Sequence, residues 1–168
     1  MYHVAYCLTF SFICWLKGDW RNWKIYYSTI LFFALGEMEL NFIFYKHSLW
    51  QYASPNLNHT FITFLWDSTV IPSTILLFIP YMPKSVSKKI LYIFLWVVIY
   101  VFSEFAFYTV GYFKYFNGWN LAYSSMLDIF IFLLLYLHYK KPLLACFAVM
   151  LTIPLFIYLT KLPLDSIK

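Results

Sequence analysis

Five carboxylic acids lie inside long apolar segments of this 168-residue chain, and no Lys or Arg lies at comparable depth in those segments. Glu37 and Glu39 share one segment, and Asp67, Glu104 and Asp128 stand in three others. An ionisable side chain in apolar surroundings is costly, so such residues are candidates for function. Their carboxylates could hold a proton, ligate a hard metal ion through oxygen, or bind an amine-bearing molecule.

Each central acid is aligned with hydrogen-bonding residues, because helix positions spaced by three, four or about eight residues share a face. The aligned residues are Asn41 for Glu37, Thr63 for Asp67, Tyr100 for Glu104, and Asn120 and Ser124 for Asp128. Polar faces of this kind turn towards the interior of a helical bundle. Glu39 is about 200° around the helix from Glu37, so these two acids cannot serve one site.

His59 stands at the start of the third apolar segment, about two helical turns from Asp67 on the same face. It could join Asp67 in holding a metal ion or moving a proton. The alternative is an interfacial histidine at a helix start that Asn58 caps.

The elements that must position these residues are membrane helices. The chain is 63% hydrophobic, 25% aromatic and only 11% charged, whereas soluble domains are about half apolar and about a quarter charged. This composition predicts an integral membrane protein, a single transmembrane helical domain over residues 1–168 with the lipid bilayer as its partner. The net charge of +5 bears on loop topology and does not indicate a nucleic-acid partner.

Six apolar segments are visible, and the fold class that they predict is an all-α, polytopic membrane helical bundle with six transmembrane helices. They run from about Tyr2–Leu16, Ile25–Tyr45, His59–Tyr81, Lys89–Val110 and Leu121–His138 to Leu143–Thr160. The first segment reaches only about 22 Å as a helix, against a hydrocarbon core of about 30 Å. Five helices span if that segment does not.

The basic residues predict the orientation of the bundle. Eight of the twelve fall in alternate loops, and these are Lys17, Arg21, Lys24, Lys84, Lys88, Lys89, Lys140 and Lys141. The positive-inside rule places these loops in the cytoplasm and leaves the N- and C-termini outside. The protein is then a multi-pass protein of the cell membrane.

Counting from the outer helix ends places the acids of four segments about 9–12 Å below the outer boundary. The shared depth predicts one cavity in the outer half of the bundle. The proposed ligand- or cation-binding set is Glu37, Asn41, His59, Thr63, Asp67, Tyr100, Glu104, Asn120, Ser124 and Asp128. Segments one and six are expected to contribute no ionisable group. Alternatively, each acid is protonated and bonds a neighbouring helix without any ligand.

Four turns resemble those of an uncharacterised family of small multi-span integral membrane proteins from Gram-positive, mostly spore-forming bacteria. The similar stretches are Gly18-Asp19-Trp20-Arg21-Asn22-Trp23-Lys24 with Tyr26-Tyr27, Leu57-Asn58-His59-Thr60, Asn117-Gly118-Trp119-Asn120, and residues 137–145. The resemblance implies a bacterial cytoplasmic membrane. It brings no activity, cofactor or site residue.

Three functions are compatible with these patterns. The first is a binding or transport module in which the carboxylates hold a hard cation or a small cationic ligand. The second is a structural or signalling membrane subunit without a ligand. The third is an intramembrane metal-dependent enzyme, but no catalytic motif appears and no catalytic residue can be assigned. The sequence indicates no particular protein partner.

Overall fold

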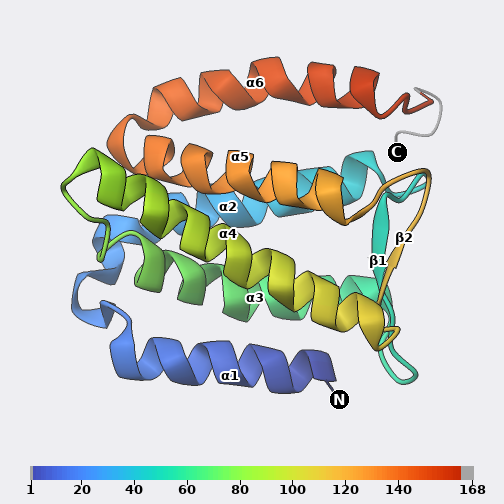
Figure 1. Ribbon diagram of the computed structural model, residues 1–168, viewed down its shortest axis with the longest axis horizontal. Helices are drawn as coiled ribbons and strands as arrows, with labels where there is room; N and C mark the ends of the chain where they lie inside the picture. Colours follow the sequence, from blue (N-terminus) through green and yellow to red (C-terminus); the bar gives the residue numbers. More distant parts are fainter. Residues whose placement is uncertain (1, 164–168) are drawn as a thin grey trace.

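The computed structural model describes residues 2–163, and six α-helices dominate this part of the chain (Figure 1), as the all-α prediction requires. The helices are α1 (Tyr2–Lys17), α2 (Trp23–Ile43), α3 (His59–Phe78), α4 (Val86–Thr109), α5 (Leu121–Lys140) and α6 (Pro142–Leu159). A short 3-10 helix, η1 (Trp20–Asn22), joins α1 to α2. Two short strands, β1 (Trp50–Tyr52) and β2 (Phe113–Tyr115), complete the described elements.

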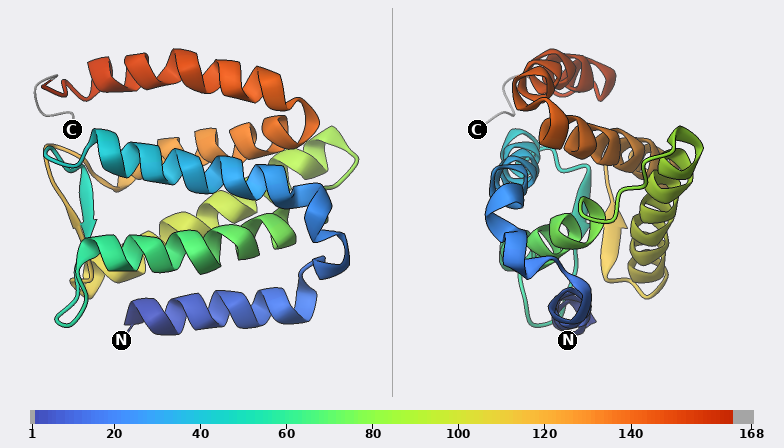
Figure 2. Two further views of the ribbon diagram at one scale, coloured as in Figure 1. Left: turned by 180° about the vertical axis from the view of Figure 1, so that it is seen from behind. Right: turned by 90° about the vertical axis from the view of Figure 1, so that its left-hand side faces the viewer.

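The six helices run lengthwise and alternate in direction, with α1 and α6 at opposite edges (Figures 1 and 2). The turns after α1, α3 and α5 lie at one end, here called the basic end because the eight basic residues named above cluster in and beside these turns. The strands lie at the other end, the sheet end. There α1 begins and α6 ends (Figure 1), so the helices have the alternation that the loop charges predict.

Four helices, α3 to α6, are long and apolar enough to cross a membrane. The expectation of six spans is therefore met only in part. α1 has 16 residues, too few for the hydrocarbon core. α2 has 21 residues, but two acids, a lysine and an asparagine reduce its apolarity.

Several helix boundaries follow from local chemistry. Asn58 caps α3, since its side-chain oxygen accepts a hydrogen bond from the Phe61 amide at 2.8 Å. Asn120 caps α5 in the same way, accepting from Ala122 at 3.0 Å. Pro142 occupies the first turn of α6, where its missing N–H costs nothing.

The main core fills the basic half of the bundle, and α3 supplies its centre. All residues from Val70 to Ile79 except Pro72 are buried. Phe78 meets Phe132 of α5 edge to face, with ring centroids 5.1 Å apart, and both side chains are fully buried. This packing fixes the C-terminal half of α3 between its neighbours, directly after Asp67.

The paired strands were not foreseen from the sequence. β1 and β2 are antiparallel, with Trp50 opposite Tyr115 and Tyr52 opposite Phe113. The Ala53 amide extends the pairing by donating to the Tyr112 carbonyl at 2.9 Å. The two loops at the sheet end are thus tied into one cover over the bundle.

Candidate functional site

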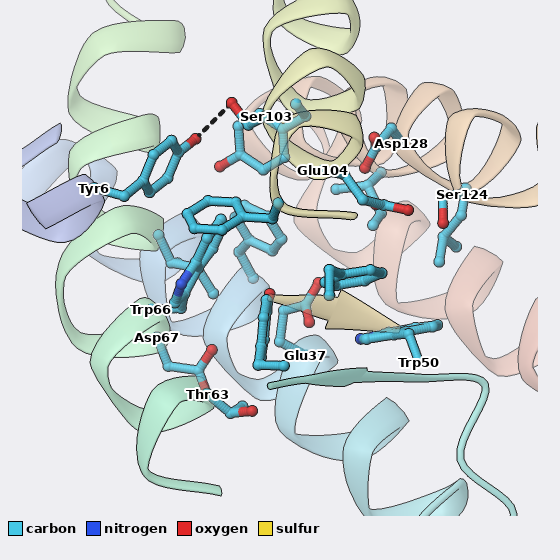
Figure 3. Close-up of a pocket in the computed structure, with 18 residues that line it drawn as sticks. Tyr6, Glu37, Trp50, Thr63, Trp66, Asp67, Ser103, Glu104, Ser124 and Asp128 are labelled. Atoms are coloured by element: carbon cyan, nitrogen blue, oxygen red, sulfur yellow. Dashed lines mark hydrogen bonds between the residues drawn. The ribbon is translucent and has the colours of Figure 1, made fainter. Parts of the chain in front are cut away.

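A cavity of about 80 Å³ lies between the main core and the strands (Figure 3). Five helices, α1 to α5, and both strands contribute lining side chains, whereas α6 contributes none. The main core closes its floor through Ile71 and Phe33. Trp50 and Tyr52 of β1 and Phe113 of β2 line it from the sheet end.

Four carboxylates from four helices line this one cavity: Glu37 of α2, Asp67 of α3, Glu104 of α4 and Asp128 of α5. In Figure 3, Asp67 lies on one side, Glu104 and Asp128 on the other, and Glu37 between them. Glu37 is near enough to Asp67 and Glu104 for direct electrostatic repulsion. No Lys, Arg or His of the described residues lines the cavity to offset these charges.

The acids are sparsely hydrogen-bonded. Glu104 accepts a 2.5 Å hydrogen bond from the Tyr115 hydroxyl. Burial and the adjacent Glu104 carboxylate both raise the pKa of Tyr115, so its phenol stays a donor. Asp128 Oδ2 and the indole N–H of Trp66 are buried without a hydrogen-bond partner in residues 2–163. Buried polar atoms are rarely left unpaired, so these two stand out.

Aromatic rings make up the rest of the wall. Eight line the cavity: Tyr6, Phe33, Trp50, Tyr52, Trp66, Tyr100, Phe107 and Phe113. Several are held in place by hydrogen bonds at the wall. Tyr6 donates to Ser103 at 3.0 Å, and the Tyr100 hydroxyl lies 2.6 Å from Thr74 Oγ1. The cavity therefore combines negative charge with fixed π-faces.

The strands are fastened to the helices over the cavity. The Tyr52 amide donates to His59 Nδ1 at 3.1 Å, so His59 Nε2 carries the proton and donates to Asn41 Oδ1 at 3.2 Å. His3 bonds the Ala53 carbonyl at 3.1 Å. Burial raises the pKa of Tyr52 well above its usual range, so this lining phenol is neutral.

The structure brings seven of the ten proposed site residues together around the cavity. These are Glu37, Thr63, Asp67, Tyr100, Glu104, Ser124 and Asp128. Asn41, His59 and Asn120 do not line it. Asn41 and His59 fasten β1, and Asn120 caps α5, so their polar groups are engaged in local structure. Whether the seven bind a ligand stays a prediction.

Sequence reasoning missed eight polar or aromatic lining residues: Tyr6, Phe33, Trp50, Tyr52, Trp66, Ser103, Phe107 and Phe113. Trp66 and Ser103 directly precede an acid, so they lie about 100° from it and escape matching at three- or four-residue spacing. Tyr6 also corrects the expectation that the first segment contributes no ionisable group, since its phenol lines the cavity. α6 contributes no cavity-lining residue.

Metal coordination has little support in the side chains. Within residues 2–163, no three His, Cys, Asp or Glu side chains are grouped closely enough to hold a metal ion. The four acids share a cavity but not a coordination shell. Both nitrogens of His59 are already hydrogen-bonded to the protein, so His59 and Asp67 do not form the pair considered from the sequence.

No protein-family model, curated protein or solved structure matches this chain. Any function of the cavity must therefore be argued from its own residues.

Proposed function

We propose that the protein is a multi-pass membrane protein whose cavity binds a small organic ammonium cation, as the binding module of a transporter. The observation that carries this proposal is the cavity lining: four carboxylates from four helices, with no basic residue from the described part of the chain. Unpaired carboxylates inside an apolar bundle are expensive unless protons or a cation neutralise them.

Six helices cross the bilayer in this proposal, with the short α1 and the more polar α2 packed beside the four apolar helices. Large exposed apolar side chains, such as Phe94 and Phe102 of α4 and Phe147 of α6, suit contact with lipid. The basic end faces the cytoplasm and the sheet end faces outside. The family resemblance adds a bacterial cytoplasmic membrane, and in this orientation the cavity lies in the outer half of the bundle.

An organic ammonium fits the cavity better than a bare metal ion. A cation over the face of an aromatic ring gains about 0.5–2 kcal/mol, and eight rings line this cavity. Carboxylates accept charge-assisted hydrogen bonds from N–H groups without the close convergence of oxygens that a metal ion needs. Asp128 Oδ2, which lacks a protein partner, is an acceptor of the required kind.

The volume limits the size of what enters. A cavity of about 80 Å³ exceeds the roughly 10–15 Å³ that one water needs, but is far below the roughly 300–1,000 Å³ of sites for drug-sized ligands. The cavity suits an ammonium group with a few carbons.

The test is ligand-induced stabilisation of the purified protein in phosphatidylcholine nanodiscs. Ethylammonium should raise the unfolding free energy by RT ln(1 + [L]/Kd), about 2.7 kcal/mol at a concentration of 100 Kd. Glu37→Gln and Asp67→Asn should lose most of this gain. Glu39→Gln is the matched control, since Glu39 stands on the same helix, is exposed and does not line the cavity.

Absence of stabilisation by ethylammonium in the wild type would overturn the proposal, and the structural or signalling subunit would become the leading function. If Glu39→Gln loses the stabilisation by ethylammonium while Glu37→Gln keeps it, the cation binds outside the cavity. Topology is tested separately by labelling Lys84→Cys and Lys114→Cys in a Cys146→Ser background. The two cysteines should react from opposite sides of the membrane.

A further inference from the structure

A second hollow opens on the side of the bundle. It is a groove of about 900 Å³ between α2, α5 and α6. α6 packs mainly against α5 at the edge of the bundle, and Ala145 is its only buried residue (Figure 2). The outer edge of the groove is therefore open towards the surrounding lipid in the proposed membrane arrangement.

The groove is apolar and closed at the sheet end. Among residues 2–163, the only charged side chains that line it are Glu37, Glu39 and Lys161. At the sheet end a second buried cluster packs together, consisting of Phe44, Leu49, Trp119 and Leu162. An occupant would thus enter from the side and not along the helix axes.

The groove and the acidic cavity share a wall. Phe33, Glu37, Leu127 and Ile131 line both hollows. Glu37 is the one charged residue among these four, and no protein hydrogen bond to its carboxylate exists within residues 2–163. Glu37 thus reaches both hollows, and only side chains of α2 and α5 separate the other three carboxylates from the apolar groove.

Access from the aqueous side is more restricted. Trp50, Tyr52 and Phe113 cover the cavity at the sheet end. The strands that carry them are fastened to each other and to His59. Asn117 adds a further tie by donating to the Ser48 carbonyl at 2.8 Å. Opening this cover would break several hydrogen bonds, whereas lateral entry displaces only side chains of the shared wall.

We propose that the ligand is an amphipathic alkylamine, whose ammonium binds in the acidic cavity while its alkyl chain lies in the groove. This inference rests on the proposed function, since it takes ammonium binding as given and adds the chain and its route. The small cavity holds the head group, and the larger groove takes the chain. The ligand reaches the site sideways from the membrane, past Glu37 and Leu127.

The length of the alkyl chain sets the size of the expected change in affinity. Burying a methylene contributes about 0.8 kcal/mol, which is about a fourfold change in affinity. Hexylammonium has four more methylenes than ethylammonium. It should therefore bind on the order of a hundredfold tighter, with Kd expressed as free aqueous concentration. A chain that remained in water would give no such gain.

The test compares ethylammonium, hexylammonium and hexan-1-ol on the full-length protein in phosphatidylcholine nanodiscs, with stabilisation as the readout. Val149→Trp and, separately, Ile153→Trp fill the groove from α6, where both side chains line it. Leu151→Trp is the control on the same helix, because Leu151 is exposed and does not line the groove. Leu151→Trp should still bind hexylammonium on the order of a hundredfold tighter than ethylammonium. In both groove variants this ratio of affinities should fall to a few-fold. Ethylammonium binding should be equal in all of them.

Each other outcome has a distinct meaning. If ethylammonium binds and hexylammonium binds no tighter, the chain lies outside the groove and this inference fails while the proposed function stands. If neither amine binds, the proposed function fails. If hexan-1-ol stabilises as well as hexylammonium and Glu37→Gln has no effect, the groove is an independent site for apolar chains, which also overturns the inference.

Discussion

The basic half and the sheet half of the bundle are built in opposite ways, and α3 passes through both. From Val70 to Ile79 it is buried at every position except Pro72, whereas from His59 to Thr69 only Ile62 and Thr63 are buried. The first stretch lies in the main core, and the second carries Asp67 beside the cavity. Close packing in one half allows the other half to keep unpaired acids without losing the fold.

The largest effect should come from the packed half. Phe132 is fully buried against Phe78 and Trp96, so Phe132→Ala should lower the unfolding free energy by about 3–5 kcal/mol. Phe102→Ala, on the exposed face of α4, should cost less than about 0.5 kcal/mol. Reversible denaturation in mixed micelles measures both. Equal losses would mean that the core does not carry the stability of the bundle.

Adding one methyl group at Gly18 and at Gly36 tests the difference in packing between the basic half and the sheet half. A Cβ on Gly18 would stand 2.5 Å from the Cys14 carbonyl oxygen and 2.7 Å from Cys14 Sγ. Gly18→Ala should therefore destabilise the protein by about 1–3 kcal/mol. A Cβ on Gly36, in the sheet half of α2, would meet nothing within 4 Å. Gly36→Ala should stabilise the helix by about 0.5–1 kcal/mol in the same denaturation assay, and a loss there would contradict the open packing of this half.

Replacing a cavity acid should have a smaller effect on folding than either core change. Glu37→Gln keeps the side-chain shape and removes a charge that no hydrogen bond from residues 2–163 stabilises, so the unfolding free energy should change by less than about 1 kcal/mol. The measurement is denaturation without any amine. A loss of several kcal/mol would show that Glu37 bonds helices together, as the interpretation without a ligand requires.

The depth of the acids and the start of α3 could be predicted from the sequence. Apolar length and the Asn58 cap predict where α3 starts, and counting residues from the helix ends predicts that four acids share one depth. These are local properties. The acids then share one level because each helical residue adds about 1.5 Å of rise, so a count of residues converts into depth.

The features that sequence missed depend on distant partners. Strands of three residues, paired between loops about 60 positions apart, leave no periodic signal. Asn41 and His59 have the spacing of site residues, but they bond each other and β1 instead. The groove exists because α6 packs on α5 and away from α2. Apolar residues are distributed all around α6, so its sequence does not indicate which face packs against the bundle.

The smallest expected effect concerns Asp19, whose carboxylate accepts hydrogen bonds from two protein side chains. Asp19, in the turn at the basic end, accepts hydrogen bonds from Tyr26 at 2.8 Å and from Asn22 at 3.0 Å. These bonds favour its charged form and lower the pKa of Asp19. A carboxyl whose pKa is lower in the folded state stabilises the fold above its unfolded pKa. That contribution is lost as the pH falls through the folded pKa.

Tyr26→Phe removes the first of these donors, so the variant should melt below the wild type at about pH 6, and the difference should narrow towards about pH 3. The cavity acids titrate in both proteins and cancel in the difference, which isolates Asp19. Melting curves in nanodiscs across this range provide the measurement. A difference that stays constant would mean that Tyr26 acts through packing alone. A narrowing difference would show that fixed hydrogen-bond donors stabilise the Asp19 carboxylate at the basic end.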